Sequence, residues 1–184
     1  MSSETAAIAS IAVPSCEKGL GHVILAPDSP RLIAGIEIQP FPLWPDDRGC
    51  FFEIGRLGRD LIADFPADST QVSAALSYPD TIKAFHYHLH QTDYWVPAIG
   101  MFQVALVDLR PDSPTFGQRN TMYAGAMRPW RIKIPPGIGH GYKVLGTETA
   151  LLIYVTSRFY DPEDEGRIAY QDPRINYDWE IQHK

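Results

Sequence analysis

The segment IKAFHYHLH, residues 82–90, carries a histidine at every second position of its second half. On a β-strand the side chains of residues i, i+2 and i+4 share one face. We therefore expect His86, His88 and His90 on one face, with Tyr87 and Leu89 on the other. If this strand belongs to a barrel, at least the first two histidines converge on one point inside it.

Short apolar or alternating runs recur on both sides of this segment. They include LIAGIEIQPF, CFFEIGRL, TQVSAALSY, FQVALVDLR, WRIKIPP and ALLIYVTSRFY, and Pro- and Gly-rich turn signals such as PDDRG, RPDSPTFG and PPGIGHG separate them. Many short strands at fairly even spacing are typical of an all-β sandwich or barrel. The one stretch with helical character, residues 55–65, predicts only one or two short helical turns at the periphery.

The chain of 184 residues is expected to form a single domain over residues 31–184, preceded by an N-terminal arm, residues 1–30. The arm is small, polar and punctuated by Pro and Gly, which predicts a loose arm or an edge strand rather than core. The tail from Tyr160 onward is charged and rich in turn residues. We expect it to pack on the outside of the barrel.

The composition excludes several classes of partner. The formal net charge is −6 and the pI about 5.4, with no basic cluster, so nucleic acid is not an expected partner. No apolar run approaches the roughly 20 residues that span a bilayer, and the start lacks the regions of a signal peptide. Cys16 and Cys50 are too few for a disulfide framework. We expect a cytoplasmic protein without a membrane partner.

Two motifs of the sequence resemble those of the cupins. The first is His86-x-His88 followed by Asp93, and the second is PPGIGH, residues 135–140. In metal-binding cupins two histidines and an acid of the first motif join a histidine of the second around one ion. The resemblance implies His86, His88, Asp93 and His140 as ligands here, a donor set that suits Fe, Mn, Ni, Zn or Cu. An Asp stands where those cupins usually have a Glu.

A second resemblance covers more of the chain, from about Ile33 to Trp179. The sequence is similar to the dTDP-4-dehydrorhamnose 3,5-epimerase family, a branch of the cupins that works without metal. The matching blocks are DDRGCFFE (46–53), Gln71, KAFHYH (83–88), VALVDLRPDSPTFG (104–117), IPPGIGHGYKVL (134–145), LLIYVTSRFYDPEDEGRI (151–168) and DPRINYDW (172–179). The resemblance implies a cupin jelly-roll barrel (a double-stranded β-helix), a homodimer, no cofactor, and a nucleotide-linked 4-keto-6-deoxy sugar as substrate.

The chemistry of such a substrate explains which side chains are needed. A proton at C3 or C5, next to the C4 ketone, is acidic because its loss gives an enolate. A base must remove it, the enolate oxygen must be stabilised, and an acid must return a proton to the opposite face. The resemblance implies His86 as the base and Tyr154, in LLIY, as the proton donor.

The resemblance also implies a set of substrate-binding positions. Arg48 and Glu53 match positions that bind the nucleotide-sugar, and Gln71 and His140 match other pocket positions. Lys83 stands where the family usually has an Arg. A cation that can meet the diphosphate or the sugar is therefore kept.

The chain departs from the family at two catalytic positions. A pocket Lys that helps to stabilise the enolate falls on Asp93 here, so an anion replaces a cation. The Asp that orients the family's base lies beyond the DW pair, and no Asp occurs among the five residues after Trp179. We expect Asp93 to be catalytic, either as the orienting carboxylate for His86 or as a metal ligand. Lys133 or Lys143 is expected to supply the lost cation.

Two other functions stay open from the sequence. A divalent metal ion held by His86, His88, Asp93 and His140 would stabilise the enolate as a Lewis acid. The protein would then be a metal-dependent cupin enzyme, an isomerase or a dioxygenase. Alternatively, the missing Lys and the missing tail Asp fit a sugar-nucleotide-binding protein that has lost catalysis.

Structural roles are the simpler alternative for individual residues. Tyr154 can be a core aromatic, and Arg48 and Glu53 can form an ion pair with no substrate contact. The run DPEDEGR, residues 161–167, is most simply a solvated turn. His90 is expected at the mouth of the barrel, in contact with solvent.

Overall fold

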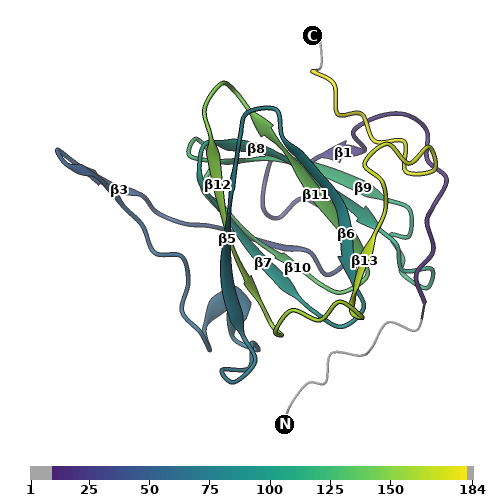
Figure 1. Cartoon of the computed structure of the whole chain (residues 1–184), viewed down its shortest axis with the longest axis horizontal. Helices are drawn as coiled ribbons and strands as arrows, with labels where there is room; N and C mark the ends of the chain where they lie inside the picture. Colours follow the sequence, from purple (N-terminus) through teal and green to yellow (C-terminus); the bar gives the residue numbers. More distant parts are fainter. Residues whose placement is uncertain (1–9, 182–184) are drawn as a thin grey trace.

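The computed structural model describes residues 10–181, and nearly all of their regular structure is β-strand (Figure 1). The first sheet contains, in spatial order, β1 (His22–Val23), β9 (Arg119–Gly125), β8 (Met101–Asp108), β11 (Ile138–Leu145), β6 (Ile82–His88) and β13 (Glu165–Arg167). The second contains β2 (Glu37–Pro40), β10 (Trp130–Ile134), β7 (Asp93–Ile99), β12 (Ala150–Thr156) and β5 (Gln71–Ser77). The expected all-β jelly-roll barrel is confirmed.

The alternation of β8 explains why the two sheets face one another. Phe102, Val104 and Leu106 point between the sheets and are at most 1% exposed. Ala105 and Val107 alternate with them and belong to a second cluster on the outer face of the same sheet. Because both faces of this strand are buried, its residues from Val104 to Val107 are all apolar.

The C-terminal tail covers that outer face. Ile175 and Trp179 are 1% and 7% exposed and lie in one apolar cluster with Phe85 of β6. Burying a side chain of this size contributes about 1.5–3 kcal/mol. The prediction that the tail packs on the outside of the barrel is confirmed for this part of it, whereas β13, in the same tail, is a strand of the first sheet.

The described part of the N-terminal arm, from residue 10 onward, also lies against the first sheet. Its strand β1 pairs in parallel with the edge of β9, through His22 with Asn120 and Val23 with Thr121. Ile24, which follows β1, is fully buried in the core between the sheets. The expectation of an edge strand is therefore confirmed, whereas the expectation that no arm residue is core is wrong, because Ile24 enters the core.

The expected helical stretch contains one short turn, the 3-10 helix η1 (Asp60–Ile62). Ile62 and Phe65 pack with Tyr94 and Val96 on the outer face of the second sheet. No helix among the described residues is both long and apolar enough to cross a membrane.

A hairpin stands apart from the two sheets. Strands β3 (Trp44–Asp46) and β4 (Gly49–Phe51) pair only with each other and protrude well away from the body of the molecule (Figure 1). Trp44 and Phe51 lie side by side on it and are 51% and 68% exposed.

Candidate active site

A cavity of about 400 Å³ opens between the two sheets. Both sheets supply its walls, since β6, β11 and β13 contribute from one side and β5, β7 and β12 from the other. Seven of the side chains that the sequence marks as candidates line it, namely Gln71, Lys83, His86, His88, Asp93, His140 and Tyr154. The sheets therefore bring most of the predicted site into one place.

An irregularity in β6 allows three of these side chains to share the cavity. His86 pairs with His140 of β11, but the next pair along is Lys83 with Tyr142, so two residues of β6, Ala84 and Phe85, oppose one residue of β11. Such a bulge reverses which side chains face inward. Lys83 consequently lines the same cavity as His86 and His88, although its odd spacing would place it on the opposite face of a regular strand.

A glycine of β11 makes the bulge possible. A Cβ atom at Gly141 would lie 2.3 Å from Cβ of Ala84 and 2.7 Å from the carbonyl oxygen of Lys83. Any larger residue would push β6 and β11 apart. Gly141, the glycine of the HG pair in the IPPGIGHG block, therefore determines the backbone geometry of β6 as well as that of its own strand.

His86 has a carboxylate beside it. Its Nδ1 lies 3.6 Å from Oε2 of Glu165 in β13, while Arg167 Nε donates to the other oxygen, Oε1, at 2.7 Å. Partial burial lowers the pKa of His86 below its usual 6.5, and the charge of Glu165 opposes that shift. Burial opposes the ionisation of Glu165, but the Arg167 hydrogen bond prevails and lowers its pKa. At neutral pH a neutral imidazole therefore faces a carboxylate.

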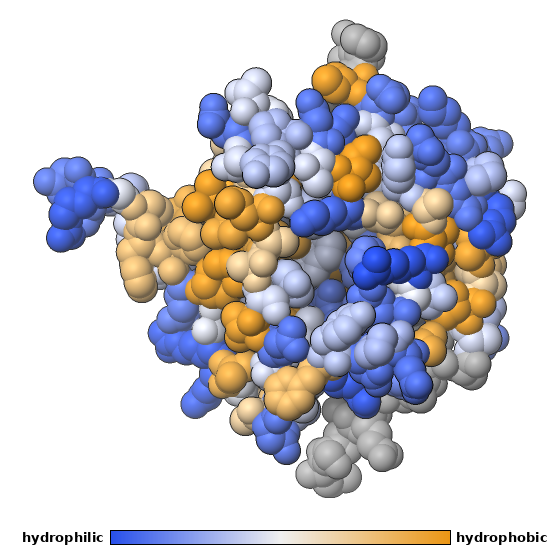
Figure 2. Space-filling view, viewed as in Figure 1, coloured by the Kyte–Doolittle hydropathy of each residue, from blue (hydrophilic) through white to orange (hydrophobic). Residues whose placement is uncertain are grey.

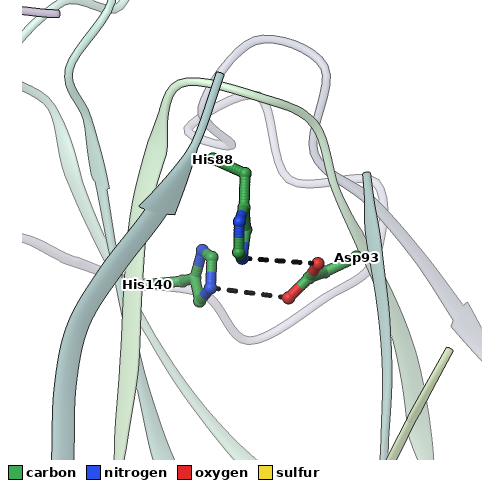
Figure 3. Close-up of side chains that lie close together, drawn as sticks. All are labelled: His88, Asp93 and His140. Atoms are coloured by element: carbon green, nitrogen blue, oxygen red, sulfur yellow. Dashed lines mark ion pairs between the residues drawn. The ribbon is translucent and has the colours of Figure 1, made fainter. Parts of the chain in front are cut away.

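Asp93 lies deeper in the cavity than this pair and is 4% exposed. Its Oδ1 is 3.9 Å from Nε2 of His88 and its Oδ2 is 3.4 Å from Nε2 of His140 (Figure 3). The Gln91 amide nitrogen donates to Oδ1 at 2.7 Å, and the indole N–H of Trp95 donates to Oδ2 at 3.2 Å. Two neutral donors therefore compensate part of the buried charge.

His140 is neutral in this arrangement. Burial lowers its pKa to about 4, and the nearby Asp93 only partly opposes the shift. Its Nδ1 lies 2.9 Å from the carbonyl oxygen of Ile138, which identifies Nδ1 as the protonated nitrogen. Nε2 then has a lone pair that faces an oxygen of Asp93. A shared proton or a cation between these two atoms would satisfy both.

The donor set fits a divalent metal ion in type but is partly occupied by hydrogen bonds. His88, Asp93 and His140 each offer one ligand atom, and these atoms lie within 4.8 Å of one another. Two imidazoles and a carboxylate suit Zn, Fe or Mn. However, the amide nitrogen of Gln91 lies 3.1 Å from Nε2 of His88 as well as contacting Asp93. His86, the fourth expected ligand, lies beside Glu165 instead.

The carboxylate next to His86 is therefore not the expected one, Asp93, but that of Glu165. The carboxylate beside His86 belongs to Glu165, whereas the carboxylate of Asp93 contacts Gln91, Trp95, His88 and His140. The interpretation of residues 161–167 as a solvated turn is therefore wrong for Glu165, which belongs to β13 and lines the cavity.

The expected nucleotide-binding pair lies outside the cavity of a single chain. Arg48 is at the tip of the protruding hairpin, where its side chain is 83% exposed and pairs with Asp46. Glu53, just after the hairpin, pairs with Arg56 at 2.9 Å. The two residues do not form an ion pair with each other among the described contacts.

The two lysines expected to replace the lost cation also lie elsewhere. Lys133 of β10 contacts Asp64 at 2.9 Å and Glu37 at 3.8 Å, and it does not line the cavity. Lys143 donates to the carbonyl oxygen of Trp179 at 3.0 Å, on the side covered by the tail. Among residues 10–181, the basic side chains at the cavity wall besides the histidines are Lys83 and Arg167.

The remaining candidates occupy the wall and the rim. Tyr154 of β12 is partly buried and lines the cavity opposite β6 and β11. Gln71 is fixed at both ends of its amide, since its nitrogen donates to Ser73 Oγ and its oxygen accepts from the backbone N–H of Tyr160. His90 is exposed, as expected for a residue in contact with solvent.

The chain is similar to known proteins over most of its length. A model of the family described as dTDP-4-dehydrorhamnose 3,5-epimerase matches residues 32–184. The spore coat polysaccharide biosynthesis protein SpsL of Bacillus subtilis is 39% identical over 155 residues, which are 83% of this chain and 100% of that protein. A dTDP-4-dehydrorhamnose 3,5-epimerase of Pseudomonas aeruginosa is 35% identical over 141 residues, or 74% and 77% of the two chains.

A solved structure is similar in three dimensions as well. It is the dTDP-6-deoxy-D-glucose-3,5-epimerase RmlC of Legionella pneumophila in complex with dTDP-4-keto-L-rhamnose. The TM-score is 0.69 at 28% identity, and the match covers 81% of this chain and 80% of that one. The residues that line the cavity, between Gln71 and Arg167, all lie inside the region that the family model matches.

Proposed function

Because the chain belongs to the dTDP-4-dehydrorhamnose 3,5-epimerase family, we propose that it is an epimerase of a nucleotide-diphosphate 4-keto-6-deoxy sugar. It inverts C3, C5 or both by removing a proton next to the C4 ketone and returning one from the other side. The observation that carries this proposal is that His86 and Tyr154 line one cavity from opposite sheets.

His86 is the proposed base. It is partly buried, its pKa is lowered, and it is therefore neutral and able to accept a proton at physiological pH. Tyr154 is the proposed acid, because its phenol can return a proton to the carbon face turned toward β12. A base and an acid on facing sheets satisfy the stereochemical need of an inversion.

Lys83 is the proposed cation for the negative charge of the substrate. The family's Lys is replaced by Asp93, and Lys133 and Lys143 are engaged outside the cavity. Lys83 is exposed at the cavity wall and forms no ion pair with a carboxylate of residues 10–181, so its ammonium group is available to a diphosphate or a developing enolate oxygen. Gln71 and His140 are proposed to contact the sugar from the two sheets.

Asp93 is proposed to act on the reaction through its neighbours. It accepts hydrogen bonds from Gln91 and Trp95 and lies beside the rings of His88 and His140 at the inner end of the cavity. Its role is therefore to hold the polar wall against which the substrate binds. No bound cofactor is needed for proton transfer by this set.

A homodimer is proposed as the functional unit. The hairpin exposes Trp44 and Phe51, and β5, at the edge of the second sheet, exposes Val72 and Leu76 at 65% and 67%. Figure 2 shows apolar residues gathered on this face, next to the hairpin. Exposed apolar groups and an open sheet edge of this kind are typical of surfaces that a partner covers. Analytical ultracentrifugation tests the prediction, which a monomer would contradict.

A dimer would also give Arg48 and Glu53 a substrate-binding role. In a single chain both lie outside the cavity, on and just after the hairpin. If the hairpin packs on a second copy, these side chains can serve the cavity of that copy. We also propose that the protein is cytoplasmic, where nucleotide sugars are available and its cysteines, Cys16 and Cys50, remain free.

A metal-dependent reaction is the second candidate function, favoured by one observation. Nε2 of His140 and an oxygen of Asp93 face each other at 3.4 Å as two acceptors. A divalent ion held by His88, Asp93 and His140 would act as a Lewis acid toward an enolate oxygen. The hydrogen bonds from Gln91 favour the metal-free assignment.

Exchange with solvent deuterium tests the proposed function. A panel of 4-keto sugar nucleotides is incubated with the enzyme in D₂O, and incorporation at C3 and C5 is followed by NMR. A binding protein without catalysis would bind members of the panel but incorporate no deuterium. Incorporation that depends on enzyme concentration supports the epimerase.

A further inference from the structure

Strand β13 lies beside the proposed base, although no residue of this strand was given a site role from the sequence. This strand pairs antiparallel with β6, with Glu165 opposite His88 and Arg167 opposite His86. Between them Gly166 lies directly against the ring of Tyr87, where an added Cβ would be 2.0 Å from Cζ. The close approach fixes the Glu165 carboxylate on the side of β6 that faces the cavity.

The carboxylate of Glu165 is held in place and ionised. Arg167 Nε donates to Oε1 at 2.7 Å, and the Glu165 side chain is only 12% exposed. This contact leaves Oε2 directed at Nδ1 of His86, 3.6 Å away. The distance is longer than a hydrogen bond, as is common for catalytic contacts that shorten when the substrate binds.

The contact decides which nitrogen of His86 carries the proton. A carboxylate beside Nδ1 favours the tautomer with Nδ1–H and leaves the lone pair on Nε2. That nitrogen is then the one able to accept a proton from the substrate. The same carboxylate stabilises the imidazolium that forms when the base is protonated.

We propose that Glu165 is the positioning residue of His86, held by Arg167, and that it takes the place of the orienting carboxylate that this chain lacks beyond Trp179. This inference rests on the proposed function, because it assigns His86 the part of the base. It gives the short strand β13 a role in catalysis, although Glu165 itself acts only through His86.

Glu165→Gln tests the proposal, since it removes the charge and keeps the shape. The expected result is a fall in kcat for deuterium incorporation of at least tenfold, with KM nearly unchanged. An Asp-to-Asn change in a serine-protease triad, which produces the wrong tautomer, costs about 10⁴-fold. Glu165→Asp is expected to recover part of the loss. Glu163→Gln, an exposed acid in the same turn, is the matched control and is expected to behave as wild type.

A second readout does not depend on turnover. Long-range ¹H–¹⁵N spectra of ¹⁵N-histidine-labelled wild-type protein report the tautomer of each ring, and His86→Gln identifies the signal of His86. The proposal expects Nδ1-protonated His86 in wild type and a shift toward the other tautomer in Glu165→Gln. Nε2-protonated His86 in wild type would overturn it.

The outcomes separate this inference from the proposed function. If wild type incorporates no deuterium from any 4-keto sugar nucleotide, the proposed function fails, and the tautomer alone decides whether Glu165 orients the ring. If wild type is active and Glu165→Gln keeps its kcat, the positioning role fails while the epimerase stands. A loss of kcat with no recovery in Glu165→Asp and no change in tautomer would also count against the role.

Discussion

His86 and Tyr154 approach the same cavity from opposite sheets, the first on β6 and the second on β12. An inversion at carbon needs a proton to leave on one side and another to arrive on the other side. The jelly-roll supplies this geometry directly, because each sheet contributes one face of the cavity. The two residues are therefore expected to fail in different ways when each is changed.

Tyr154→Phe is predicted to separate proton removal from inversion. His86 still removes the proton and returns solvent deuterium to the same face, so labelled but uninverted substrate accumulates. Formation of the epimer is expected to slow by about 10²–10⁴-fold, which is the usual rate contribution of general acid catalysis. Chiral analysis of the labelled product by NMR measures both rates.

Tyr170→Phe is the matched control for that change. Tyr170 is 41% exposed and lies outside the cavity. It is expected to leave both rates unchanged. Equal losses of exchange and inversion in Tyr154→Phe would argue against the donor role.

The pH dependence of kcat/KM is predicted to follow the neutral form of His86. Burial lowers the pKa of this ring below 6.5, so the acid limb of the profile should have its midpoint below pH 6.5. Glu165 raises the same pKa, and its change to Gln should move the limb to still lower pH. A midpoint above pH 6.5, or a limb that moves upward in Glu165→Gln, would be inconsistent with this assignment.

Stability is predicted to fall in acid because His140 is buried in its neutral form. Its pKa is about 4 in the folded protein against 6.5 as the ordinary value, so the unfolded chain binds the proton first as pH falls. The stability that the neutral, buried His140 ring allows is present in full above pH 6.5 and is lost as the pH falls toward 4. The loss amounts to about 3 kcal/mol of unfolding free energy. Urea unfolding of wild type and His140→Gln, compared at pH 7, 6 and 5, measures it.

The difference between the two proteins isolates His140 from other titrating groups. Wild type should lose more stability than His140→Gln over this range. Parallel curves for the two proteins would mean that the burial of this ring is not linked to acid unfolding.

Much of the site was predictable from the sequence, and the failures have identifiable causes. Alternation in β6 correctly placed His86 and His88 on one face of a barrel strand. The same alternation would have excluded Lys83, which only the bulge opposite Gly141 turns toward the cavity. Glu165 was missed because its contact with His86 depends on pairing between strands that are far apart in the sequence.

The fold itself followed from short apolar runs and turn residues, but the positions of Arg48 and Glu53 did not. The two strands of the hairpin pair only with each other. Their local sequence pattern does not differ from that of strands in the barrel, so the sequence could not show that the hairpin protrudes. The end of the tail was correctly placed outside, since aromatic residues such as Tyr177 and Trp179 pack on the apolar outer face of the first sheet. The place of β13 within that sheet was not predicted.

Removal of metal is predicted to leave the reaction intact. The amide of Gln91 already engages atoms of His88 and Asp93, and proton transfer is assigned to side chains of the chain itself. Protein treated with chelator should therefore exchange deuterium at the wild-type rate, and elemental analysis should find well under one metal ion per chain. One ion per chain, together with activity that is lost on chelation and restored by that ion, would establish the metal-dependent reaction instead.

The most direct test of the central claim is deuterium incorporation by wild type and His86→Ala with the same panel of 4-keto sugar nucleotides. Wild type should incorporate deuterium at C3, C5 or both of at least one sugar. His86→Ala should bind that sugar nucleotide but exchange about 10²–10⁴-fold more slowly, as expected when a general base is removed. No exchange by wild type with any member of the panel, or exchange by His86→Ala at the wild-type rate, would contradict the account.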